Sequence, residues 1–379
     1  MNGSGPIRIL HIIDKLDISG ASIHGITQAL KWWIPRFDKH EFEFTVCSLR
    51  AQGPGGKFLE REGITVLYLG RGKFSPMTLF ELLALIRQER PHVLHLHGYG
   101  AANFGRLASW ITKIPNIVHE HVVLPNQPFH QTVADTILSP LTSKAIAISR
   151  PVRDFMVQRR KVSPARMETF FYGLPLAEFT YPDEYLVKAK RKELNITSEE
   201  SVISTIGRLA NMKGQIYFIR AAAEIVKSAP QTRFLVVGDG PDFSLLQQEA
   251  QRLNLGDRLV FTGFCEDVPV LLALSDIVVI PSIYGEGGPL TLFEAMNIRK
   301  PVVGTTTGMM DEVITHGETG FIIPPKDVSA IVEKLLFLLQ NPLLAKQMGE
   351  KGWEVCQYYD IAYSVKRLAK IYQELFSSS

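Results

Sequence analysis

The stretch that decides the fold is residues 277–296, which read IVVIPSIYGEGGPLTLFEAM. It begins with four β-branched apolar residues, passes through glycines at 285, 287 and 288, and continues into an apolar segment from Pro289. A buried strand that leads through a glycine-rich turn into a helix is typical of a parallel α/β sheet. Proline is well suited to the first position of a helix, so we expect this helix to begin at Pro289.

The same alternation of short apolar runs with longer amphipathic stretches extends along the whole chain. A first series of strands is expected at 7–13, 42–47, 64–69, 93–97, 116–121 and 145–148. A second series is expected at 202–206, 233–237, 259–261, 277–280, 301–303 and 320–323, followed by helices at 330–339, 345–356 and 362–376. Strands that alternate with helices predict βαβ units, and hence parallel sheets covered by helices on both faces.

The length of 379 residues predicts two domains, because a single core usually serves about 100 to 200 residues. The two strand series fit this division, with one doubly wound α/β domain at 1–172 and a second at 173–355. The fold class is therefore α/β with two Rossmann-like sheets.

Composition excludes several functional classes. Lys+Arg 41 minus Asp+Glu 38 gives a net charge of +3, so the bulk charge does not indicate a nucleic-acid binder. The three cysteines, Cys47, Cys265 and Cys356, are odd in number and far apart, which favours a reducing cytoplasm over a disulfide framework. No apolar run reaches the roughly 18 to 20 residues that a membrane span needs, so we expect a cytoplasmic protein.

Polar and glycine-rich turns follow the strands of the second series. Because the carboxyl ends of parallel strands meet at one edge of the sheet, these turns are expected to form a ligand site. The turn 207–214 carries Arg208 and Lys213, whose charges can neutralise a diphosphate in place of a metal ion. The amides of 288–292, at the beginning of a helix, suit a phosphate.

Two glutamates, Glu286 and Glu294, lie eight residues apart on this loop and helix. Their spacing predicts that both face the same cleft. Carboxylates accept hydrogen bonds from paired hydroxyl groups, so they suit the ribose and the sugar ring of a nucleotide sugar.

The first domain carries a second set of candidates. Gly20 and Ala21 follow the first strand, and their amides are expected to face the same phosphate. His95 and His97 end one strand, and His119 and His121 end the next. Side chains two apart on a strand share a face, so each pair is expected to point together, either toward a donor substrate or toward a metal ion.

Taken together, these motifs resemble those of the retaining glycosyltransferases of family 4, and the resemblance covers almost the whole chain. That family carries two glutamates separated by seven residues, as Glu286 and Glu294 are here. Its Gly-Arg-Leu and Lys-Gly elements match 207–209 and 213–214, and its Val-Gly-Asp-Gly-Pro turn matches 237–241. One departure is Ala21, where the family commonly has a second glycine.

The resemblance implies the GT-B architecture, with two Rossmann-like domains facing across a cleft and the segment 356–379 returning to the first domain. It also implies roles for the site. Arg208 and Lys213 would bind the donor diphosphate, Glu294 the ribose, and Glu286 the transferred sugar, with His121 rather than His119 beside that sugar and His97 at the acceptor. The expected donor contacts also include Gly20, Ala21, Gly207, Gly238, Phe264, Cys265, Glu266, Gly287, Gly288, Pro289, Leu290, Thr291 and Leu292.

The implied activity is retaining transfer of a sugar from a UDP- or GDP-linked donor to a hydroxyl acceptor, with no cofactor, no metal ion and no nucleic-acid partner. The acceptor is a glycan, a lipid-linked sugar or a small molecule. The alternatives are an epimerase or phosphorylase of the same fold and, with less support, a metal-dependent hydrolase that uses the histidine pairs. Contact with an anionic membrane through Trp32, Trp33 and the basic segment 150–166 is also open, beside the alternative that the tryptophans are packed against a sheet.

Overall fold

The computed structural model describes residues 5–17, 25–72, 75–124, 127–265 and 267–378. Contacts within the chain divide it into two compact units. Unit 1 comprises Met1–Gly173 and Ile361–Ser379, and unit 2 comprises Leu174–Asp360.

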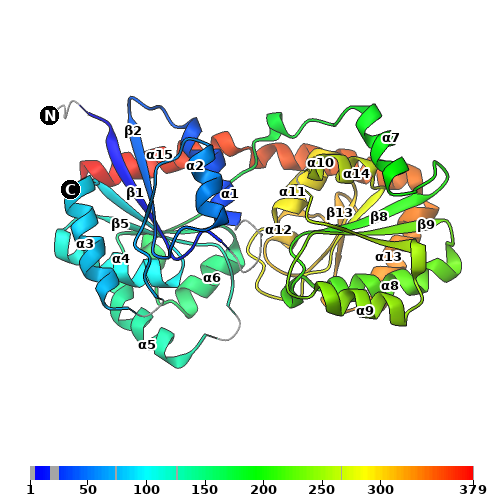
Figure 1. The fold of residues 1–379 in the computed structure, drawn as a ribbon, viewed down its shortest axis with the longest axis horizontal. Coiled ribbons are helices and arrows are strands. Elements are labelled where there is room, and N and C mark those ends of the chain that lie inside the picture. Colours follow the sequence, from blue (N-terminus) through cyan, green and yellow to red (C-terminus); the bar gives the residue numbers. More distant parts are fainter. Residues whose placement is uncertain (1–4, 18–24, 73–74, 125–126, 266, 379) are drawn as a thin grey trace. The chain divides into compact units, whose positions relative to one another are not determined.

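Unit 1 contains a parallel sheet of seven strands in the order β3-β2-β1-β4-β5-β6-β7 (Figure 1). The strands are β1 (Ile7–Ile13), β2 (Phe42–Ser48), β3 (Val66–Tyr68), β4 (Val93–His97), β5 (Asn116–Glu120), β6 (Lys144–Ala147) and β7 (Met167–Thr169). The first six confirm the expected strands to within two residues at each end. The seventh, a three-residue edge strand, was not predicted.

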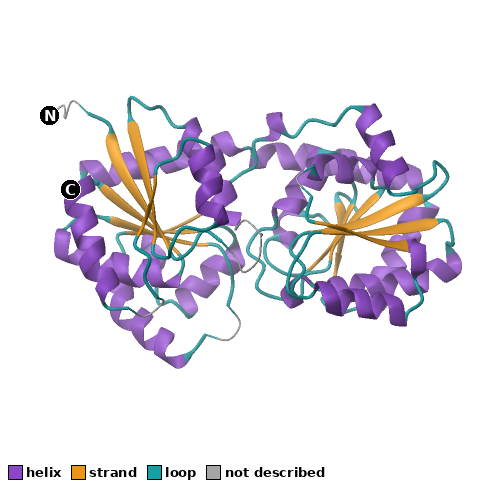
Figure 2. Cartoon of the chain, in the orientation of Figure 1, coloured by secondary structure: helices purple, strands orange, loops and turns teal. Residues whose placement is uncertain are grey.

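Helices cover both faces of this sheet (Figure 2). They are α1 (Gly25–Trp33), α2 (Pro54–Arg61), α3 (Met77–Glu89), α4 (Tyr99–Thr112), α5 (Phe129–Leu138), α6 (Arg150–Gln158) and α15 (Ile361–Ser377). Helices α1 and α15 contact each other on one face, and α3 and α4 contact each other on the opposite face. Gly105 of α4 packs so tightly on Leu96 of β4 that a Cβ atom there would collide with it.

The helix α15 is an integral part of unit 1, because its apolar side chains are buried there. Leu368, Ile371 and Tyr372 are at most 1% exposed. Ser364 Oγ donates a hydrogen bond to the carbonyl oxygen of Tyr172 at 2.6 Å. The boundary before α15 falls at 360/361 rather than at the expected 355/356, since Tyr359 still packs on Phe293 in unit 2.

Unit 2 contains a parallel sheet of six strands in the order β10-β9-β8-β11-β12-β13. The strands are β8 (Ser201–Ile206), β9 (Thr232–Val237), β10 (Leu259–Gly263), β11 (Ile277–Ile280), β12 (Val302–Thr305) and β13 (Gly320–Ile323). The helices are α7 (Glu184–Glu193), α8 (Gln215–Ser228), α9 (Phe243–Arg252), α10 (Val268–Leu274), α11 (Leu290–Asn297), α12 (Met310–Val313), α13 (Val328–Gln340) and α14 (Pro342–Cys356).

The sheet of unit 2 has an apolar layer on each face. The larger core, around Phe218, Phe234 and Leu335, lies under α8, α9 and α13, and a smaller one, around Val202 and Leu271, lies under α7 and α10. In both units the strand order reverses next to the first strand, at β1/β4 and at β8/β11. Ligands of open α/β sheets bind at the carboxyl ends of strands at such a reversal.

One sequence expectation changes in the structure, and the alternative of packed tryptophans is confirmed. Pro289 is the N-cap of α11, with φ −73° and ψ 125°, so the helix begins one residue later than expected. Trp32 and Trp33 are 5% and 1% exposed and pack inside unit 1, which leaves neither ring for a membrane. Among the described residues no single helix has the length and apolar composition of a membrane span, although the bent pair Val328–Gln340 and Pro342–Tyr359 meets both criteria together.

Candidate active site

The turns after β8 and β9 in unit 2 are packed directly against each other. Gly238 has φ +129°, and a Cβ atom there would collide with the carbonyl oxygen of Gly207. The Leu209 amide donates to the Asp239 carbonyl oxygen at 3.0 Å. Gly238 is therefore required by close backbone approach, whereas Gly207 is favoured by its φ of +146°, since a Cβ atom there would meet nothing within 4 Å. The two turns together position the backbone of Arg208, which follows Gly207.

The turns after β8 and β11 are joined by an ion pair. Nζ of Lys213 donates to Oε2 of Glu286 at 2.7 Å, and the Ser282 hydroxyl donates to the same oxygen at 2.8 Å. Gly214, at φ +69°, lies so close to Pro281 that no side chain fits. Lys213 and Glu286 are 73 positions apart in sequence, and the strand reversal brings them together.

One N–H group of the Arg208 side chain makes no hydrogen bond with any described residue. Its carbonyl oxygen accepts a hydrogen bond from Nε2 of Gln215 at 2.9 Å, which fixes the backbone. Its Nε is buried and has no hydrogen-bond partner within the part of the chain that the structure describes. Burial lowers the pKa of the guanidinium, an effect that Asp242 opposes. A buried N–H without an acceptor is costly, which makes Arg208 a candidate to bind an anionic ligand.

Glu294 lies on α11, whose first turn is attached to the sheet by a hydrogen bond from the Thr291 hydroxyl to the Ile206 carbonyl oxygen at 3.3 Å. Gly287, Gly288, Pro289 and Leu292 around this helix start are buried, and Leu290 is half-buried. Burial raises the pKa of Glu294 to about 7. Its carboxyl group therefore sits near half-ionisation at neutral pH, and a hydrogen-bond donor from a ligand would favour the charged form.

The histidines of both predicted pairs come together in unit 1. Nδ1 of His97 lies 3.0 Å from Nε2 of His121, and Nε2 of His95 lies 3.1 Å from Nδ1 of His119. A fifth histidine, His11 of β1, was missed, because only the pairing register of β1 with β4 places it beside His95. His119 is 1% exposed and His121 is half-buried.

The structure describes some of the remaining expected donor contacts and leaves others outside the described residues. Gly20, Ala21 and Glu266 lie outside the described residues. Phe264 is 53% exposed after β10, and Cys265 is half-buried. The roles assigned to His97 at the acceptor and to His121 at the sugar stay predictions.

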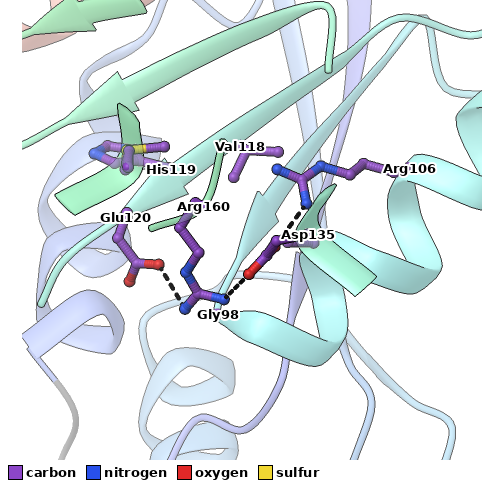
Figure 3. A pocket seen from close by; sticks show the side chains of 9 residues that line it. Gly98, Arg106, Val118, His119, Glu120, Asp135 and Arg160 are labelled. Carbon is purple, nitrogen blue, oxygen red and sulfur yellow. Dashed lines mark hydrogen bonds and ion pairs between the residues drawn. The ribbon is translucent and has the colours of Figure 1, made fainter. Parts of the chain in front are cut away.

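A buried ion-pair network beside β5 was also missed by the sequence reasoning (Figure 3). Arg160 pairs with Glu120 and with Asp135, each at 3.1 Å, and Arg106 pairs with Asp135 at 3.2 Å. Burial raises the pKa of Glu120, and Arg160 opposes that shift. The cavity that these residues line measures about 10 Å³, enough for one water molecule and too small for a sugar.

Comparison with known proteins identifies the class of protein. Residues 187–355 match the family model for glycosyl transferases group 1, and residues 25–178 match the model for Glycosyltransferase Family 4. The chain belongs to the family 4 glycosyltransferases. It is accordingly a retaining-type glycosyltransferase of GT-B fold that transfers a sugar from a nucleotide sugar to an acceptor.

Two curated relatives are similar to this glycosyltransferase over most of their length. The alpha-D-kanosaminyltransferase of Streptomyces kanamyceticus is 28% identical over 307 residues, which cover 76% of this chain and 79% of the relative. The UDP-Gal:alpha-D-GlcNAc-diphosphoundecaprenol alpha-1,3-galactosyltransferase of Escherichia coli is 23% identical over 311 residues, 79% of each chain.

Solved structures share the fold of the glycosyltransferase over its full length. HepE of Anabaena, determined in complex with UDP, superimposes with a TM-score of 0.84 at 22% identity and covers 97% of this chain and 100% of its own. A glycosyltransferase from Rickettsia africae also gives 0.84, at 19% identity, with 99% and 100% covered.

Proposed function

We propose that this glycosyltransferase takes its sugar from a UDP- or GDP-linked donor, retains the anomeric configuration, and needs no metal ion at the donor diphosphate. The observation that carries this proposal is the contact between Lys213 and Glu286 at 2.7 Å. It links a cationic turn to an acidic turn on the two sides of the β8/β11 reversal, where a ligand of this fold is expected.

The chemistry follows from the charges. The bond from the anomeric carbon to the diphosphate oxygen breaks through an oxocarbenium-like state, and negative charge develops on the leaving oxygens. The guanidinium of Arg208 and the ammonium of Lys213 stabilise that charge. The acceptor hydroxyl attacks from the same face, the new glycosidic bond forms, and a phosphate oxygen takes the hydroxyl proton.

Glu286 has a supporting role in this scheme. Its Oε2 already accepts from Lys213 and from Ser282, and the side chain is 7% exposed. A carboxylate held in this way orients the sugar and balances positive charge rather than attacking the anomeric carbon. Glu294 binds the ribose hydroxyls, and the backbone amides of residues 290–292 bind the distal phosphate. Residues 264–265 contact the base of the nucleotide.

The experiment is a thermal-unfolding screen of UDP- and GDP-sugars, followed by assays of nucleotide release. A donor that binds only the folded chain raises its melting temperature. Release of nucleoside diphosphate that depends on a hydroxyl acceptor supports transfer, and product NMR should give an unchanged anomeric configuration. Conversion of the donor sugar without any acceptor would favour an epimerase instead.

For the acceptor we propose a lipid-linked sugar at an anionic membrane. The segment 150–166 exposes Arg150, Arg153, Arg159, Lys161 and Arg166 against one exposed acid, Asp154. The Arg166 guanidinium donates to the carbonyl oxygens of Pro140 and Thr142 just beyond α5, which itself exposes Phe129, Val133 and Ile137. Apolar side chains beside cations suit an anionic bilayer surface.

Vesicle co-sedimentation tests this surface. Binding to vesicles with anionic lipid, but not to neutral ones, is expected at low salt. The paired variant Phe129→Ser/Ile137→Ser should weaken it. Absence of binding to anionic vesicles at low salt would refute membrane contact and leave the transfer reaction untouched.

A further inference from the structure

Five histidines gather on one face of the unit 1 sheet. His11, His95, His97 and His119 are at most 1% exposed, and His121 is half-buried. The register places His11 beside His95 on the β1/β4 pair and His97 beside His119 on the β4/β5 pair. Sugar transfer as proposed above gives expected roles to His97 and His121, but none to the buried rings of His11, His95 and His119 beside them.

Three members of the cluster have the arrangement of a metal site. His97, His119 and His121 each bring one ring nitrogen to within 4.8 Å of the others. His119 and His121 are two apart at the end of one strand, so they share a face, and His97 joins them from the neighbouring strand. Nδ1 of His97 and Nε2 of His121 are 3.0 Å apart. Two nitrogens about 2.0–2.1 Å from a tetrahedral ion are separated by about 3.3 Å, so this pair needs only a small adjustment, while the nitrogen of His119 must approach the pair from within 4.8 Å.

His119 supplies the third nitrogen. Its Nδ1 is engaged with Nε2 of His95 at 3.1 Å. Its Nε2 is buried, and no described residue provides it with a hydrogen-bond partner. An unsatisfied buried nitrogen costs stability, and coordination to an ion removes that cost.

The remaining nitrogens of two ligands have the outer partners that a metal-bound histidine requires. Nε2 of His97 lies 2.9 Å from Nδ1 of His11. His95, the partner of His119, is in turn 2.7 Å from the hydroxyl of Tyr372 on α15. Such outer hydrogen bonds fix the tautomer and the orientation of each ligand ring.

A second trio, His11, His95 and His97, also satisfies the distance criterion. It is a weaker candidate, because both nitrogens of His95 are already engaged, by Tyr372 and by His119. All three of its rings are fully buried, whereas His121 reaches the surface and offers a way in.

We propose that His97, His119 and His121 bind one Zn²⁺ ion, with water or an anion as the fourth ligand. This site goes beyond sugar transfer and does not depend on it: it lies in unit 1, whereas the cations assigned to the donor diphosphate lie in unit 2. Nε2 of His121 would coordinate the ion, although the same side chain is expected to contact the sugar. A titration with metal in the absence of nucleotide sugar therefore tests metal binding separately from sugar binding.

The test uses the full chain without a polyhistidine tag, treated with a chelator and then titrated with Zn²⁺ or Co²⁺. We expect one equivalent of Zn²⁺ to bind and the melting temperature to rise with Zn²⁺ concentration. We also expect Co²⁺ to give the visible absorption of a four-coordinate site. Less than about a tenth of an equivalent, with no Co²⁺ spectrum, would overturn the proposal and leave a cluster held only by hydrogen bonds between histidines.

Variants locate the ion within the chain. His121→Gln, at the half-buried end of the cluster, should weaken Zn²⁺ binding at least 100-fold while the metal-free protein unfolds at the same temperature. His11→Gln should weaken it about 10- to 100-fold through the lost outer hydrogen bond. His40→Gln, at an exposed position of the same unit, is the control and should bind as the parent does. Unchanged affinity in His121→Gln would contradict the assignment.

Discussion

At the residue scale, the candidate donor site consists of charged groups held by specific partners. Lys213 forms an ion pair with Glu286, the buried Nε of Arg208 has no acceptor among the described residues, and Glu294 carries a raised pKa. Strand-end turns and family motifs named all four residues as candidates, and their roles at a donor stay predictions. The Lys213–Glu286 contact itself was beyond sequence reasoning, since it depends on how two turns 73 residues apart are packed.

Glu294 should make stability depend on pH. The pKa of its carboxyl group is about 7 in the folded chain and 4.5 ordinarily, so protonation of Glu294 stabilises the folded protein. The free energy of unfolding should therefore fall as the pH rises from about 4.5 through 7, by about 3 kcal/mol at most. The measurement is urea unfolding between pH 4.5 and 8 for the parent and for Glu294→Gln. The glutamine variant should lack this component and be the more stable protein at pH 8; parallel pH profiles would contradict the shift.

At the element scale, fully buried strands were predictable and a half-exposed one was not. β4 and β11 have the expected bounds, because four or five consecutive buried residues leave little ambiguity. The edge strand β7 was missed, since three half-exposed residues carry no periodic pattern. The position of His11 against His95 depended on register, which an apolar pattern of period two does not specify for a strand buried on both faces.

The turn after β9 should tolerate no side chain at Gly238. An alanine there would meet the Gly207 carbonyl oxygen and would also be forced to φ +129°. We expect Gly238→Ala to lower the free energy of unfolding by about 2–4 kcal/mol and to reduce donor binding, because the turn carrying Arg208 must move. The control is Gly72→Ala, where a Cβ atom meets nothing within 4 Å. Equal melting temperatures for the two variants would refute this account of the turn.

At the scale of the whole molecule, the chain leaves unit 1 after Gly173 and returns to it at Ile361. The α/β class and two-sheet organisation followed from length and strand pattern. The contribution of α15 was implied by family resemblance alone, because its apolar spacing suits packing on any sheet. Only the structure identifies its partners in unit 1, among them His95.

Removal of α15 should therefore affect unit 1 selectively. The helix buries Ile361, Leu368, Ile371, Tyr372 and Leu375. At about 1.5–3 kcal/mol for each buried side chain, their loss is comparable to the whole stability of a domain. Hydrogen exchange of a chain ending at Asp360 should show protection lost in β1 and β4 and retained in β8 and β11. Full protection of β1 and β4 would contradict the assignment of α15 to unit 1.

The most direct test of the central claim compares turnover with donor binding in Arg208→Ala. The guanidinium is proposed to stabilise charge that develops only as the sugar leaves, so kcat should fall about 10²- to 10³-fold while donor Kd, measured by calorimetry, changes by less than about tenfold. Arg220→Ala, which removes a surface partner of Glu249 on the same domain, should match the parent in both. A variant with weakened donor binding and intact kcat would contradict the claim.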